Sequence, residues 1–172
     1  LLHGRKESRK GKAPMPVALK MRNYLEVTTP KHRDAVVSIA LSTHKLAVER
    51  LRWNIPSVQR ENRLCRRCVS DVETPEHVLL RCMPGSENGD EDEDVDDLDE
   101  RAKVVEKMHD LRRCFWRDLA RMTPHMTPPV DAHEDTSFLK SLLADRPSIE
   151  VTAKYCYRAL KNVYKLPMYR PL

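Results

Sequence analysis

The sequence has few aromatic residues and few glycines, and it has no long apolar run. Only 5% of its 172 residues are Phe, Trp or Tyr, and only 4 are glycine. No apolar stretch approaches the roughly 20 residues that span a membrane, so we expect no membrane partner. No glycine-rich phosphate loop is present, and we expect no small-molecule substrate. With 40% apolar residues, 33% charged residues and a mean hydropathy of −0.63, the chain is expected to build a modest core.

Apolar residues recur at helical spacing along much of the chain, which predicts a mainly α fold. Residues 31–53 are typical of two short helices that meet at Ser42 and Thr43, where a hydroxyl could cap the second helix. A longer helix is expected from Asp99, with an apolar stripe formed by Val104, Met108, Leu111, Phe115, Leu119 and Met122. Two further helices are expected to begin near Asp135 and after Ser148.

Charge is distributed unevenly along the chain. Residues 1–85 hold 17 Lys and Arg against 8 Asp and Glu, residues 86–100 hold 10 acids and no base, and residues 101–172 hold 14 bases against 8 acids. We predict a flexible basic arm over 1–23, a helical linker with a metal-binding module over 24–85, a disordered acidic linker over 86–100, and a C-terminal helical region over 101–172 that packs on the module.

The basic excess outside the acidic tract favours a polyanionic partner, most simply RNA or DNA. The bland alternative is that the charge serves solubility alone. The arm could contact phosphates, act in nuclear import or simply be a solvated tail. The acidic tract could be a plain linker or an internal decoy that occupies the basic surfaces.

Three of the five cysteines fall in one cluster with a histidine, in the stretch CRRCVSDVETPEHVLLRC. Cys65, Cys68, His77 and Cys82 have the spacing C-x2-C-x8-H-x4-C, which is typical of a tetrahedral zinc site. Four protein ligands leave no open position, so one structural Zn²⁺ is expected. Reduced thiols also favour a nuclear or cytoplasmic location.

The second pair of ligands raises a geometric problem. Thr74 and Pro75 are typical of a helix start, which places His77 in the first helical turn. Five residues later, an ideal helix would point Cys82 about 140° away from His77. The helix must therefore tighten, fray or end before Cys82. Val69 follows the second cysteine, at a position where such turns often have glycine.

Arginines surround the cluster and are the candidate nucleic-acid-binding residues. They are Arg50, Arg52, Arg60, Arg63, Arg66, Arg67 and Arg81. Trp53 could stack on a base, although we favour a place in the core for it. His44 is interpreted as a structural hydrogen-bonding residue.

The runs HRDAVVSIALSTHKLAVERLRW, RLCRRC and ETPEHVLLRC resemble the C-terminal region of LINE-type (non-LTR) retrotransposon reverse transcriptases, fungal ones especially. The resemblance implies a helical linker leading into a CCHC zinc knuckle, with Cys65, Cys68, His77 and Cys82 as ligands. It also implies a role in positioning template RNA and target DNA, with upstream polymerase domains as partners. No polymerase Y-x-D-D motif and no RNase H arrangement of acids is present, so no catalysis is expected from this chain itself.

Two other classes of function remain as alternatives. The chain could be a protein–protein interaction module in which the zinc site only stabilises the fold and the helices over 101–122 and 148–165 dock on a partner. A cysteine-dependent hydrolase would need Cys114 or Cys156 beside a histidine base such as His109 or His125. Nothing in the sequence indicates an activated nucleophile of this kind.

Overall fold

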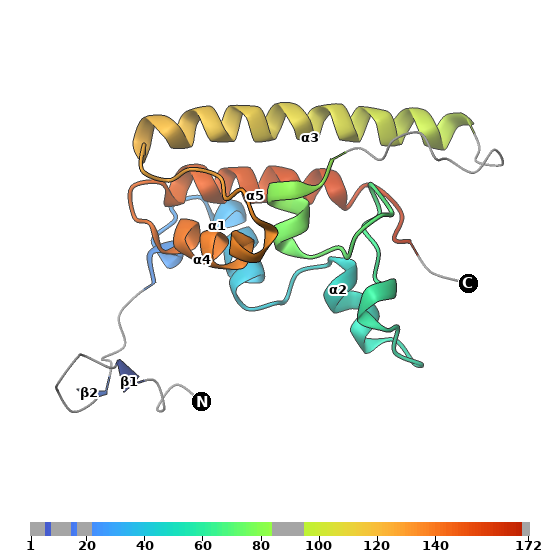
Figure 1. Cartoon of the computed structure of the whole chain (residues 1–172), viewed down its shortest axis with the longest axis horizontal. Helices are drawn as coiled ribbons and strands as arrows, with labels where there is room; N and C mark the ends of the chain where they lie inside the picture. The colour runs from blue at the N-terminus through green and yellow to red at the C-terminus, as the bar shows by residue number, and fades with distance from the viewer. Residues whose placement is uncertain (1–5, 8–14, 17–21, 84–94, 170–172) are drawn as a thin grey trace.

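The computed structural model describes residues 6–7, 15–16, 22–83 and 95–169, the side chains of 6–7, 15–16 and 95–102 excepted. The expected mainly α fold is confirmed (Figure 1). The longer helices are α1 (Pro30–Ala40), α3 (Val95–Met122), α4 (Asp135–Ala144) and α5 (Ile149–Val163). Shorter ones are η1 (Asn23–Leu25), α2 (Ala47–Arg50), η2 (Leu51–Trp53), η3 (Arg60–Asn62), the π-helix η4 (His77–Arg81) and η5 (Ala132–Glu134).

The predicted arm and acidic linker lie mostly outside the described residues. Within the arm, β1 (Lys6–Glu7) and β2 (Met15–Pro16) form a two-residue antiparallel pair, which was not expected. Helix α3 begins at Val95 and therefore includes the end of the acidic tract, four residues before the expected start. In the described part of the chain, no helix combines the length and apolar character that crossing a membrane requires.

Helix α5 is the centre of the fold. Figure 1 shows α3 lying along one side of α5, with α1 and α4 on the other side. The packed face of α5 is buried, and it includes the small residues Ala153, Cys156 and Ala159. Small side chains let neighbouring helices approach closely, which explains how one helix can pack against three others.

Helix α3 follows the predicted stripe for most of its length. Val104, Met108, Phe115 and Leu119 are buried, whereas Met122 at the helix end is exposed. The ring of Phe115 stacks on that of Tyr155 from α5, with centroids 4.2 Å apart and an interplanar angle of 8°. This pair ties the two longest helices together.

The junction between α1 and α2 differs from the prediction. Ser42 takes a left-handed backbone with φ of 54°, and the N-cap of α2 is Leu46, with no side-chain cap. Ser42 and Thr43 therefore form a turn between the helices and do not cap the second one. This turn brings His44 into a buried position.

The segment that carries the second pair of cluster residues is held by three helices. Arg112 of α3 donates from Nε to the carbonyl of Leu79 over 3.2 Å, and the hydroxyl of Tyr155 from α5 donates to the same carbonyl. Arg81 forms an ion pair with Asp135 at the start of α4, with Nε 2.8 Å from Oδ2. Carbonyls at the end of a helix lack intrahelical partners. Arg112 and Tyr155 therefore supply hydrogen bonds that the Leu79 carbonyl would otherwise lack, and together with the Arg81–Asp135 pair they hold η4 in position.

Candidate metal centre

Cys65 and Cys68 lie in a tight turn between two short extended segments. Leu64 and Val72 form an isolated antiparallel bridge, and the amide of Val69 donates to the carbonyl of Cys65 over 2.8 Å. Val69 has a φ of 53°. A β-branched residue is strained in this left-handed region by roughly 1–2 kcal/mol, which accounts for the frequent glycine at such positions.

His77 and Cys82 come from η4, and the backbone there resolves the predicted geometric problem. The Thr74 hydroxyl accepts from the amide of His77 over 3.1 Å, so Thr74 caps the helix as predicted. The helix then widens into a π-helix, in which the amide of Cys82 donates to the carbonyl of His77 over 2.6 Å. This five-residue hydrogen bond returns Cys82 to the side of the helix that holds His77.

The helix ends at Arg81, immediately before Cys82, which has non-helical backbone angles φ of −49° and ψ of 110°. The expectation that the helix ends before Cys82 is confirmed. The widening was not anticipated, because a tightened or frayed turn was the expected route to the same result. A π turn has no clear signature in a single sequence, and it depends on what the helix packs against.

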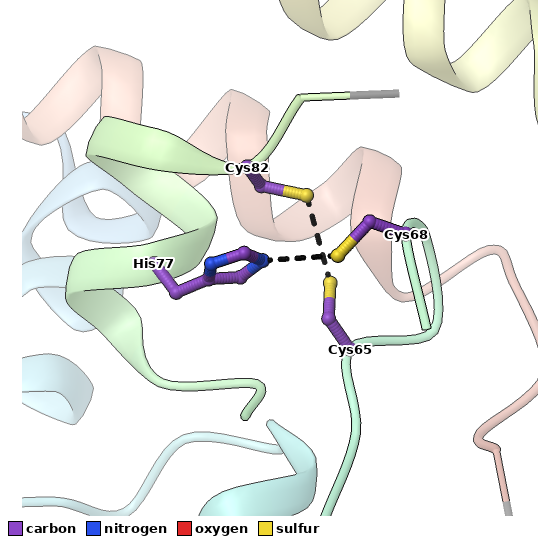
Figure 2. A group of neighbouring side chains, drawn as sticks. All are labelled: Cys65, Cys68, His77 and Cys82. Carbon is purple, nitrogen blue, oxygen red and sulfur yellow. Dashed lines mark hydrogen bonds between the residues drawn. The ribbon is translucent and has the colours of Figure 1, made fainter. Parts of the chain in front are cut away.

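The four ligand atoms converge on one point (Figure 2). All of them lie within 4.8 Å of one another. Sγ of Cys65 is 3.6 Å from Sγ of Cys82, and Sγ of Cys68 is 3.3 Å from Nε2 of His77. Ligands at about 2.1–2.3 Å from a tetrahedral ion are roughly 3.4–3.8 Å apart, so the cluster has the dimensions of a site for one metal ion.

Protons and charge are shared among these groups. Hydrogen bonds from Cys65 and Cys82 lower the pKa of the Cys68 thiol, whereas hydrogen bonds with Cys65 and Cys68 raise the pKa of Cys82. Burial lowers the pKa of His77, but the hydrogen bonds and charges of Cys65 and Cys68 outweigh it and raise this pKa to about 10. A metal ion that binds here must displace these protons.

Asp71 lies behind the imidazole of His77. Its Oδ2 is 3.2 Å from Nδ1 of His77, although the alignment is not that of a hydrogen bond. A carboxylate on this side favours a proton on Nδ1 and leaves the lone pair of Nε2 for the metal. Asp71 also accepts from the amide of Val72 over 2.7 Å, which fixes the carboxylate in the turn.

Arg67 provides an independent test of whether a metal fits. Its side chain is buried with an exposed fraction of 7%, and Nε and Nη1 have no hydrogen-bond partner in the described part of the chain. A buried, unpaired guanidinium is costly unless a negative charge lies nearby. The charge of Arg67 acts to lower the pKa of Cys82, against the dominant hydrogen bonds that raise it. Three thiolates with a divalent cation carry one net negative charge, which Arg67 would balance.

Arg66, a predicted nucleic-acid contact, is buried in an ion pair with Glu73. Nε of Arg66 lies 2.7 Å from Oε1 of Glu73, and Nη2 lies 2.9 Å from Oε2. Nη2 also donates to the carbonyl of Lys45 over 3.0 Å. The guanidinium groups of Arg66 and Arg67 are therefore inside the fold and are not available to a phosphate at the surface. Neither Glu73 nor this pairing was predicted. The only signal for it in the sequence is that Glu73 follows Arg66 and Arg67 within a few residues.

Two more of the predicted arginines, Arg63 and Arg81, form hydrogen bonds between segments of the fold. Arg63 is half-buried and donates to the carbonyls of Val48 and Val58 over 2.8 and 2.9 Å. Arg63 thereby joins α2 to the segment that precedes η3. Arg81 pairs with Asp135, whose hydrogen bonds raise the pKa of the Arg81 guanidinium.

The remaining predicted arginines lie at the surface on and after α2. Arg50, Arg52 and Arg60 are exposed. Trp53 is 75% exposed, so our preference for a core position was wrong, and the guanidinium carbon of Arg52 lies 5.3 Å from its ring centroid. We call Arg50, Arg52, Trp53 and Arg60 the α2 patch.

Cys156 has no feature of a nucleophile. It is buried on the packed face of α5, and this burial raises the pKa of its thiol to about 12.

Comparison of the chain with protein-family models, curated proteins and solved structures found no match in any of the three.

Proposed function

We propose that Cys65, Cys68, His77 and Cys82 bind one structural Zn²⁺. Three thiolates with one imidazole favour zinc over hard cations such as magnesium or calcium. With four protein ligands, Cys65 and Cys82 fully buried, and η4 held by α3, α4 and α5, the site is closed. The ion would stabilise the fold and hold Arg63 and the α2 segment in place.

We further propose that this zinc-stabilised module binds single-stranded RNA or DNA through the α2 patch. The observation that carries the proposal is the exposed indole of Trp53 with Arg52 beside it. The indole of Trp53 is 75% exposed, and bases stack on accessible aromatic rings of this kind. Arg50 and Arg60 would contact the phosphates on either side.

Titration of a fluorescently labelled single strand, followed by anisotropy, tests this proposal. Trp53→Ala is expected to weaken binding by about 5- to 150-fold, because one base–aromatic stack contributes about 1–3 kcal/mol. Tyr169→Ala is the matched control, since Tyr169 is also exposed but lies outside the patch. Equal affinities for wild type and Trp53→Ala would refute a stacking role.

Salt dependence provides a second measurement. Charge reversal at Arg50, Arg52 and Arg60 should lower both the affinity and the slope of log K against log salt. Reversal of Arg121 and Arg158, which are exposed on α3 and α5, should leave the slope nearly unchanged. An affinity that does not change with salt would exclude binding through phosphates.

By resemblance, we propose that the chain is the C-terminal part of a LINE-type reverse transcriptase. It would then present template RNA or target DNA to polymerase domains in the nucleus, without catalysis of its own. The proposal predicts an open reading frame that continues upstream into a polymerase with a Y-x-D-D motif. An upstream sequence of another class would contradict it.

One observation favours protein docking as a second candidate. Ile55, two residues after Trp53, is fully exposed, and an aliphatic side chain contributes little to nucleic-acid binding. Ile55→Ser separates the two functions. Strand affinity should remain unchanged under the nucleic-acid proposal, whereas a docking interface centred here would lose its partner.

A further inference from the structure

A cavity of about 480 Å³ lies between α1 and the second half of α5, and the turn before α2 also contributes to its lining. This volume is within the range of small-ligand pockets. The cavity is separate from the metal centre and shares no residue with the α2 patch. Lys45 in its wall is two residues before the start of α2, so the two surfaces are adjacent along the chain.

Positive charge predominates in the wall of this cavity. Four lysines contribute to it, Lys31 from α1, Lys45 from the turn, and Lys161 and Lys165 from the end of α5 and just beyond it. All four are exposed, and none has an ion-pair partner in the part of the chain that the structure describes. Asp34 is the only acid in the wall. The cavity is therefore complementary to an anion.

Aromatic and apolar groups line the rest of the wall. Tyr157 and Tyr164 contribute rings, and Leu160 lies between them along α5. The Tyr164 hydroxyl accepts from the amide of Lys45 over 2.9 Å, which couples the ring to the turn. Arg66 also lies over the Tyr164 ring, 5.7 Å from its centroid. The buried Arg66–Glu73 pair thus helps to hold this wall in place.

His44 adds a buried polar group to the wall without a protein partner. Only 5% of its surface is exposed, and its Nδ1 forms no hydrogen bond within the described residues. Burial lowers the pKa of His44, so the imidazole is neutral near pH 7 and can donate or accept. An unsatisfied buried polar atom costs about 1–3 kcal/mol, which a ligand atom that reaches Nδ1 would offset.

We propose that this cavity binds one nucleoside monophosphate unit, with the phosphate among the four lysines and the base against Tyr157, Tyr164 and His44. The combination of a cationic rim, aromatic walls and a neutral imidazole matches an anion attached to a planar polar ring. The unit is either a free nucleotide or one nucleotide of a bound strand. Only the second source rests on the proposed function.

Calorimetric titration of the zinc-loaded full chain with adenosine 5′-monophosphate tests the proposal. Saturable binding is expected, about tenfold tighter than that of ribose 5-phosphate, because the base contributes. The double variant Lys161→Glu, Lys165→Glu should weaken it at least about tenfold. The control variant Lys107→Glu, Lys154→Glu changes the same charge outside the cavity and should bind as wild type does.

Two results would overturn the proposal. One is the absence of saturable binding in the millimolar range, and the other is equal affinity for adenosine monophosphate and ribose 5-phosphate. Competition with a labelled strand identifies the source, because displacement indicates a nucleotide of that strand and binding without displacement indicates a free nucleotide. Trp53→Ala should retain mononucleotide binding, so failure of the α2 patch and failure of the cavity give different results.

Discussion

Removing one member of the buried Arg66–Glu73 ion pair should lower the free energy of unfolding far more than removing an ion pair at the surface. Glu73 is completely buried and accepts from Arg66 Nε at 2.7 Å and Nη2 at 2.9 Å, as well as from the amides of Ala47 and Arg66. Arg66→Met leaves the carboxylate without its counter-ion. Glu73→Leu leaves the guanidinium without its counter-ion and two backbone amides without their acceptor.

Breaking a buried pair from one side costs about 3–5 kcal/mol, which is a large share of a typical total stability of about 5–15 kcal/mol. The double variant should lose about 2–3 kcal/mol less than the sum of the single losses, because neither charge remains unpaired. Urea unfolding of the zinc-loaded chain, monitored by circular dichroism, measures all three values.

The exposed pair Arg113–Asp110 is the matched control, with side chains 72% and 56% exposed. Its removal should cost below about 1 kcal/mol. A loss for Arg66→Met as small as this control, together with weaker binding to nucleic acid, would refute the assignment of Arg66 to the interior. It would instead restore Arg66 as a phosphate contact.

Three further outcomes are expected. If the cluster binds the proposed zinc, chelation or His77→Ala should abolish most of the helical signal and release about one zinc per chain, because a closed structural site contributes to folding. Val69→Gly should stabilise the chain by up to about 1 kcal/mol in urea unfolding, since glycine relieves the strain at a φ of 53°. Burial lowers the pKa of His44 below its usual 6.5, against a weaker raising effect of nearby glutamates. The unfolded chain therefore binds more protons, and stability present above about pH 6.5 is lost as the pH falls, by up to about 1.4 kcal/mol at pH 5.5. His44→Asn should remove this part of the pH dependence.

Each of these outcomes has a clear opposite. Full helicity without metal would contradict a structural zinc site. A destabilising Val69→Gly would show that chain entropy outweighs the strain. An identical pH dependence in wild type and His44→Asn would show that the imidazole is protonated as readily in the folded chain as in the unfolded one.

The helices and the residues of the candidate metal centre follow from the sequence because they depend on local order along the chain. The stripe from Val104 to Leu119 and the cap at Thr74 depend on neighbours three or four residues away. The spacing of Cys65, Cys68, His77 and Cys82 likewise identifies the four residues that meet. The geometric conflict at Cys82 could also be stated in advance, since it needs only the helical repeat.

The tertiary structure decided whether each arginine and the ring of Trp53 are buried or exposed. Arg66 and Arg67 are indistinguishable from surface cations in a basic run, and only the folded chain places Glu73 and the thiols beside them. Trp53 is exposed because α2 and η2 lie at the edge of the fold, which no local pattern shows. The π turn that starts at His77 is contacted by Arg112 and Tyr155, which both donate to the carbonyl of Leu79 and are far away in sequence. Such pairings arise from contacts between distant segments, so a periodic pattern cannot encode them.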